Sequence, residues 1–205
     1  MENEEENNIV KEPYSDYGLY SYADYLTWDI DHMVELIKGK VFKQAAAAPR
    51  RIHQKLAVKL ITKLSNFLTG KTCEAYVAPF DVRLPVKSKK HEDILTVVQP
   101  DICVVCDPEK LDDLGCVGAP DLIMEILSPS NNKKEIQNKY EVYEESGVRE
   151  YWIIHPYEKT LLVYTLSDRK YIPSRLFTLG DHVASRCIEG FVLDLDELFE
   201  GLDEI

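Results

Sequence analysis

The chain of 205 residues lacks several features that would assign it to a particular class of protein. No apolar run approaches the roughly 18 residues that a membrane-spanning helix needs. The first eight residues are acidic, whereas a secretory signal begins with basic residues and continues with an apolar stretch. No internal repeat is present, and low-complexity sequence is confined to the N-terminal segment. These absences predict a cytoplasmic protein.

Cysteine is scarce and odd in number, since the chain has only Cys73, Cys103, Cys106, Cys116 and Cys187. In an intracellular chain, scattered cysteines favour reduced thiols over a disulfide framework. Cys103 and Cys106 form a C-x-x-C pair inside an apolar run that is typical of a buried strand, where residues three apart point to opposite faces. Two such thiols are poorly placed to share a zinc ion, so we expect buried core cysteines there.

Positive charge is in deficit, because 24 lysines and arginines face 36 acidic residues and the formal net charge is −12. This excess of negative charge is unfavourable for a protein that binds a nucleic-acid backbone. Five glutamates against one lysine place −4 of this charge in residues 1–12, within a segment, 1–18, that we expect to be a solvated tail. The remaining −8 lies in residues 13–205. Residues 19–205 are long enough for one domain with a sizeable core.

Residue spacing predicts the order of helices and strands. Helices are predicted over 21–28, 50–68, 133–146 and 194–200, and the first of them begins with a capping-box pattern at Ser21. Strands are predicted over 33–37, 40–42, 73–84, 97–106, 121–128, 150–156, 161–166 and 171–177. The runs 73–84 and 97–106 are expected to pair as neighbours. The order predicts a mixed α/β sheet with peripheral strands.

Glu125 is the most informative residue, because it interrupts an otherwise apolar strand and must be satisfied by a partner, a metal ion or a proton. Asp101 opens the preceding strand after Pro100, so the two carboxylates converge if these strands pair. Oxygen ligands of this kind suit Mg²⁺ or Mn²⁺. The alternative for each residue is a salt bridge or a capping contact.

Lys139 lies on the helix that follows the Glu125 strand, and a helix folded back onto the sheet would return its ammonium to the carboxylates. There it would stabilise charge on a phosphoryl oxygen or orient the attacking water. The alternative is a solvated lysine on an amphipathic helix. Asp121 is a rival for Asp101, but it stands four residues before Glu125 on one strand, about 13 Å away at ~3.3 Å per residue.

Several segments together resemble one known family. They are Val34 to Val41, Arg51 to Gln54, Val98 to Asp101, Ala119 to Ser130, Lys139 to Tyr143, Gly147 to Trp152 and Leu193 to Phe199. In this order they are similar to the Uma-type family of restriction endonucleases, within the PD-(D/E)XK nuclease superfamily. The Glu-x-Leu-Ser-Pro-Ser and Gly-Val-x-Glu-Tyr-Trp blocks together carry the resemblance.

The resemblance implies a restriction-endonuclease-like core of helix, three antiparallel strands, helix and strand, and metal-dependent hydrolysis of DNA. Pro100-Asp101 matches the PD element and Glu125 the following acidic residue, so both are expected metal ligands. Leu127 stands where the plain motif has lysine, and Lys139 is the matching position on the next helix. Glu35 and His53 lie in the family's N-terminal segments and are second-tier catalytic candidates, with a salt bridge and a helix-start packing role as their alternatives.

Two other function classes compete with the nuclease hypothesis. A catalytically silent binding or protein-interaction module of the same fold would suit the acidic surface. A cysteine hydrolase has little support, because no cysteine stands in a recognisable nucleophile setting beside a histidine. For a nuclease that cuts both strands, a homodimer with two sites related by a two-fold axis is expected.

Overall fold

A computed structural model of the chain describes residues 18–30, 33–43, 50–129 and 133–202. The acidic segment predicted as a solvated tail lies outside the described residues except for Gly18. Among the helices described, none has the length and apolar character needed to cross a membrane.

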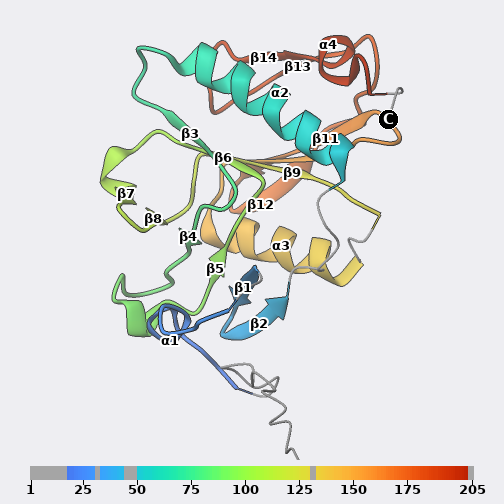
Figure 1. Cartoon of the computed structure of the whole chain (residues 1–205). Coiled ribbons are helices and arrows are strands. Elements are labelled where there is room, and N and C mark those ends of the chain that lie inside the picture. Colours follow the sequence, from blue (N-terminus) through green and yellow to red (C-terminus); the bar gives the residue numbers. More distant parts are fainter. Residues whose placement is uncertain (1–17, 31–32, 44–49, 130–132, 203–205) are drawn as a thin grey trace, which may run out of the picture.

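The main sheet has the strand order β12-β11-β10-β9-β6-β3 and contains the predicted core (Figure 1). The core elements in chain order are α2 (Arg51–Leu68), β3 (Glu74–Val77), β6 (Ile102–Val105), β9 (Leu122–Ile126), α3 (Lys133–Ser146) and β10 (Glu150–His155). Strands β3, β6 and β9 are antiparallel neighbours, and β10 runs parallel to β9. Strands β11 (Thr160–Ser167) and β12 (Lys170–Pro173) extend the sheet in antiparallel fashion. The predicted order of helix, three antiparallel strands, helix and strand is therefore confirmed.

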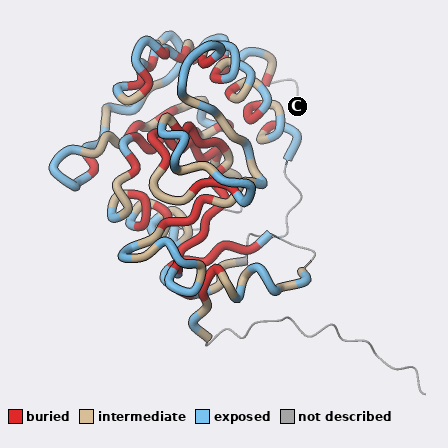
Figure 2. The backbone as a smooth tube through the Cα atoms, turned by 90° about the vertical axis from the view of Figure 1, so that its left-hand side faces the viewer, coloured by how far each residue is buried: buried red, intermediate tan, exposed pale blue. Residues whose placement is uncertain are grey.

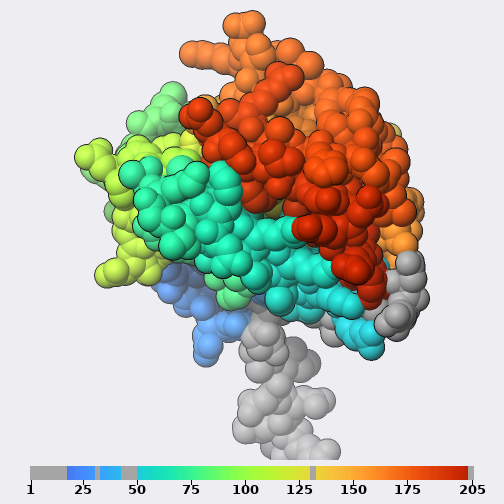
Figure 3. Space-filling model, turned by 90° about the horizontal axis from the view of Figure 1, so that it is seen from above, coloured from blue at the N-terminus to red at the C-terminus, as the bar shows by residue number. Residues whose placement is uncertain are grey.

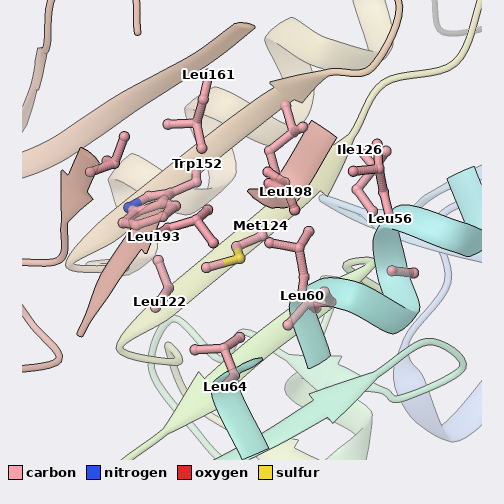
Figure 4. Close-up of a cluster of buried hydrophobic side chains, with 14 of the residues drawn as sticks. Leu56, Leu60, Leu64, Leu122, Met124, Ile126, Trp152, Leu161, Leu193 and Leu198 are labelled. Atoms are coloured by element: carbon pink, nitrogen blue, oxygen red, sulfur yellow. The ribbon is translucent and has the colours of Figure 1, made fainter. Parts of the chain in front are cut away.

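Helix α2 covers one face of this sheet because leucines recur at every fourth position. Leu56, Leu60 and Leu64 are buried against Met124 and Trp152 of the sheet (Figure 4). The same face receives the C-terminal elements β13 (His182–Ala184), β14 (Val192–Asp194) and α4 (Leu195–Phe199), which lie beside α2 (Figure 3). Asp194 caps α4 by accepting hydrogen bonds from two backbone N–H groups, as predicted.

Helix α3 covers the opposite face, where Val142 and Tyr143 are buried against Ile123 and Tyr151. The strands between the two helices form the buried centre of the molecule (Figure 2). Because side chains alternate along a strand, Leu122, Met124 and Ile126 belong to the cluster under α2, whereas Ile123 belongs to the cluster under α3. Glu125 shares the face of Ile123, so this alternation directs its carboxylate toward α3.

A second sheet has the order β2-β1-β5-β4-β8-β7. Its strands are β1 (Val34–Ile37), β2 (Lys40–Lys43), β4 (Val82–Arg83), β5 (Val97–Val98), β7 (Leu111–Asp112) and β8 (Gly115–Val117), and the short helices near it are α1 (Tyr22–Tyr25), η1 (His91–Asp93) and η2 (Pro108–Lys110). The predicted helix over 21–28 is shorter than expected, although its capping box between Ser21 and Asp24 is present.

Two predicted strands are each divided between the two sheets. The run 73–84 becomes β3 and β4, and the run 97–106 becomes β5 and β6. Pro79 and Pro100 stand at the two breaks, and proline has no N–H with which to continue a strand ladder. The predicted pairing of the runs holds for both parts, since β3 pairs with β6 and β4 with β5.

The prediction of reduced thiols is wrong for two of the five cysteines. Cys73 and Cys106 form a disulfide, because the pairing of Glu74 with Val105 brings the flanking residues opposite one another. Cys103, Cys116 and Cys187 are free thiols. Cys103 packs in the cluster under α3, whereas Cys106 packs against the cluster under α2. The C-x-x-C residues therefore point to opposite faces, as expected.

Candidate active site

Asp101 lies at the bend where the chain leaves the second sheet and enters β6. Since Ile102 pairs with Met124, the next step along the two strands brings Asp101 beside Glu125 and Ile126. The backbone N–H of Ile126 donates a hydrogen bond to Asp101 Oδ2 over 2.7 Å. The strand pairing therefore brings Asp101 next to Glu125, as the sequence predicts.

Glu125 is buried, with 6% of its surface exposed, and two groups from α3 converge on one of its oxygens. Lys139 Nζ donates to Oε1 over 3.0 Å, and the Tyr143 hydroxyl donates to the same oxygen over 2.8 Å. Lys139 and Tyr143 are four residues apart, so they occupy one face of the helix. Both donors therefore act on Oε1, and neither of these two hydrogen bonds involves Oε2.

Lys139 also lies 3.2 Å from Glu35 Oε1, so its ammonium bridges two carboxylates. Glu35 comes from β1 of the second sheet, and the same oxygen accepts a hydrogen bond from the Gln99 backbone N–H over 2.8 Å. The contact connects the second sheet with α3 across the buried interior. Glu35 therefore holds the ammonium of Lys139 in place.

The site carries more negative than positive charge. Burial raises the pKa of Glu125; the Lys139 ammonium opposes this shift, and the charges of Asp101 and Glu35 add to it. Burial alone would lower the pKa of Lys139, but the charges of Glu125, Glu35 and Asp101 outweigh burial and hold that pKa well above its ordinary value. The three carboxylates thus favour the protonated form of Lys139.

His53 lies in the first turn of α2, and its Nε2 is 3.2 Å from Asp101 Oδ1. Burial lowers the pKa of His53, but the hydrogen bond and charge of Asp101 and the charge of Glu125 outweigh burial, so the pKa is raised. Among the described residues, nothing forms a hydrogen bond with its buried Nδ1. The Nε2 atom of His53 therefore orients the Asp101 carboxylate, and Nδ1 is a second polar atom of the same ring at the site.

The donor set fits a hard divalent cation. No cluster of three or more His, Cys, Asp or Glu side chains suited to a metal ion occurs in the described part of the chain. Mg²⁺, however, commonly binds through one or two carboxylates and keeps several water ligands. Asp101 and Glu125 supply two adjacent carboxylates, and the pKa of Glu125 is raised first by burial and then by the charges of Asp101 and Glu35, which a cation would offset.

The remaining candidates lie elsewhere. Asp121, the rival to Asp101, accepts a hydrogen bond from the Cys106 N–H and pairs with Arg149 at 3.0 Å, so it is structural. The side chain of Gln99 donates to Asp81, whereas its backbone N–H serves Glu35. The contact of Tyr143 with Glu125 was not predicted, although its spacing of four from Lys139 places both residues on one face of α3.

Comparisons with known proteins identify a family and a similar fold. A family model described as "Uma2: Putative restriction endonuclease" matches residues 22–196. Over 137 residues the chain is 24% identical to "Uncharacterized protein slr1290" of Synechocystis sp., covering 66% of this chain and 67% of that protein. The fold is similar to the crystal structure of "a putative nuclease belonging to DUF820" from Anabaena variabilis, with a TM-score of 0.71 at 18% identity, covering 89% of this chain and 99% of that one. At this level of identity the structural likeness establishes the fold.

Proposed function

Because the chain belongs to the Uma2 family, whose model is described as "Putative restriction endonuclease", we propose that it hydrolyses DNA phosphodiester bonds with a divalent metal ion held by Asp101 and Glu125. The observation that carries the proposal is the convergence of Lys139 and Tyr143 on one oxygen of a buried Glu125 beside Asp101. Bound Mg²⁺ or Mn²⁺ would supply Lewis-acid stabilisation of charge on the phosphoryl oxygens.

Three other residues of the chain would then support catalysis. The Lys139 ammonium stabilises negative charge that develops on the scissile phosphate. Glu35 keeps this ammonium directed at the site through their 3.2 Å contact. His53 holds the Asp101 carboxylate in orientation from the α2 side. For cleavage of both strands, we expect two copies of the chain to present their sites about a two-fold axis.

Replacing Asp101 with asparagine tests the metal site directly. The substitution keeps the size of the side chain but removes one of two anionic ligands, so Mn²⁺ affinity is expected to fall at least tenfold and plasmid nicking to fall with it. Calorimetric titration with Mn²⁺ and gel analysis of plasmid would measure both in the same samples.

The matched control is Asp121→Asn, which changes the rival aspartate that contacts Arg149 and the Cys106 N–H. This variant should keep the metal affinity and the nicking activity of the wild type. Full nicking by Asp101→Asn would contradict the assignment of Asp101 as a ligand.

A silent interaction module of the same fold is the second candidate, favoured by the net charge of −12. It predicts no nicking by the wild type and no binding of Mg²⁺ or Mn²⁺ at millimolar concentration. Mn²⁺-dependent nicking that requires Asp101 would exclude it.

Replacing Tyr143 with phenylalanine tests how Glu125 is held. The substitution removes the 2.8 Å hydrogen bond to Oε1 and leaves the ring in the core, so we expect a loss of about tenfold or more in Mn²⁺ affinity with a native fold. Tyr171→Phe is the control, since its hydroxyl donates to the Val148 carbonyl in the same cluster. Equal Mn²⁺ affinities for the two variants would show that Tyr143 has only a packing role.

A further inference from the structure

The turn that follows β10 lies at the same edge of the sheet as the candidate active site. Strands β9 and β10 are parallel, with Ile153 beside Glu125 and Ile154 beside Ile126. The Leu127 N–H continues this ladder by donating to the Ile154 carbonyl over 2.8 Å. Tyr157 stands three residues beyond Ile154, and 49% of its surface is exposed. An aromatic ring therefore faces solvent close to Glu125 and Asp101.

Two arginines stand at the start of α2, and one of them contacts Tyr157. Arg50 and Arg51 are exposed, and they precede His53, which contacts Asp101. At ~1.5 Å of rise per residue, both lie within about 5 Å of His53 along the helix axis. Arg50 Nη1 is 3.4 Å from the Tyr157 hydroxyl, to which it donates, so the arginine and the exposed ring are neighbours.

Three lysines along the middle of α2 contact the C-terminal elements. Lys55 donates to the Gly201 carbonyl, and Lys59 donates to three carbonyls at the end of α4. Lys63 pairs with Glu197. Residues 50–63 contain no acidic side chain, although the chain as a whole carries −12. Arg50 and Arg51 thus place positive charge at the end of α2 that is next to the candidate active site. The three lysines along the middle of α2 bind the C-terminal elements.

Arginine beside an exposed aromatic ring is the pairing by which proteins bind unpaired nucleotides. Bases stack on the ring while the guanidinium groups contact the phosphates, and a base inside a duplex has no free face to offer. Building on the nuclease function proposed above, we infer that Tyr157, Arg50 and Arg51 form a contact surface for single-stranded DNA beside the scissile phosphate. The favoured substrate is then DNA with an unpaired segment at the cleavage point.

Binding measured without divalent ions tests this inference apart from catalysis. A fluorescent single-stranded 20-mer and its blunt duplex would be titrated with the full chain and followed by anisotropy. We expect the wild type to prefer the single strand, Tyr157→Ala to weaken that binding roughly tenfold or more, and Tyr157→Phe to retain it. Arg50→Gln and Arg51→Gln should each reduce the slope of log K against log salt by about 0.7.

Ile172→Ala on β12 is the matched control, since Ile172 is also an exposed apolar residue and lies on the edge strand of the sheet. It should bind both DNAs as the wild type does. Unchanged single-strand binding by Tyr157→Ala, or a wild type that binds the duplex equally well, would overturn the inference.

Plasmid nicking with Mn²⁺ separates this failure from failure of the proposed function. If the wild type nicks plasmid and Tyr157→Ala still binds single-stranded DNA normally, the proposed nuclease function stands and the proposed contact surface is rejected. If the wild type does not nick plasmid and Tyr157→Ala loses single-strand binding, the contact surface stands and the proposed nuclease function is rejected.

Discussion

Replacing Glu125 with glutamine is expected to abolish plasmid nicking and the stabilisation of the folded protein by Mn²⁺. The substitution keeps the side-chain volume and allows Tyr143 to donate to the amide oxygen, but it removes the charge that a metal ion requires. A ligand that binds only the native state raises the unfolding temperature by mass action, and this rise should disappear with the ligand site. Differential scanning fluorimetry with and without Mn²⁺ would measure it beside nicking.

The same experiment checks that Glu125→Gln remains folded. Glu125 lies among Asp101 and Glu35, and its raised pKa indicates that its charge is costly without a metal ion. We therefore expect the metal-free variant to unfold at a temperature no lower than that of the metal-free wild type. Nicking that survives in this variant would refute the proposed site altogether.

Replacing Lys139 with methionine is expected to damage both activity and stability. Lys139 is buried, and its ammonium contacts Glu125 at 3.0 Å and Glu35 at 3.2 Å, so its removal leaves two buried carboxylates without a cation. Breaking a buried ion pair in this way costs about 3–5 kcal/mol of unfolding free energy. Loss of charge stabilisation at the phosphate should reduce the cleavage rate on the order of 10²- to 10³-fold.

Two comparisons separate these effects. Lys38→Met removes an exposed pair with Glu145 and should cost no more than about 1 kcal/mol in urea unfolding. Mn²⁺ should restore part of the stability of Lys139→Met, because a cation then neutralises Glu125, while cleavage stays slow. Normal cleavage by Lys139→Met at saturating Mn²⁺ would show that the lysine only neutralises the carboxylates.

The core and the convergence of Asp101 with Glu125 were predictable because they depend on local patterns. The apolar spacing of 133–146 gave helix α3 with its observed bounds, and an Asp and a Glu on neighbouring strands meet once the strands pair. The position of Lys139 followed from a helix that folds back on its own strand. The catalytic roles of these residues remain predictions.

The features that the sequence did not predict depend on contacts between distant parts of the chain. The division of the run 97–106 at Pro100 depends on a second sheet whose partner strand, β1, lies some 60 residues earlier. The disulfide between Cys73 and Cys106 follows from strand register, which residue counts do not reveal. Tyr143 lies in the apolar cluster under α3, and its contact with Glu125 depends on a strand that lies 18 residues earlier in the chain.

The lysine of this site stands on a helix, while Leu127 occupies the strand position where the plain motif has lysine. Two groups on one strand keep their separation for as long as the strand exists. Lys139 and Glu125 keep theirs only while α3 remains docked on the sheet through residues such as Val142 and Tyr143. Displacement of this helix alone would therefore separate Lys139 from Glu125, even with the sheet and α2 in place. The proposed activity would depend on the docking of one helix as well as on the pairing of strands.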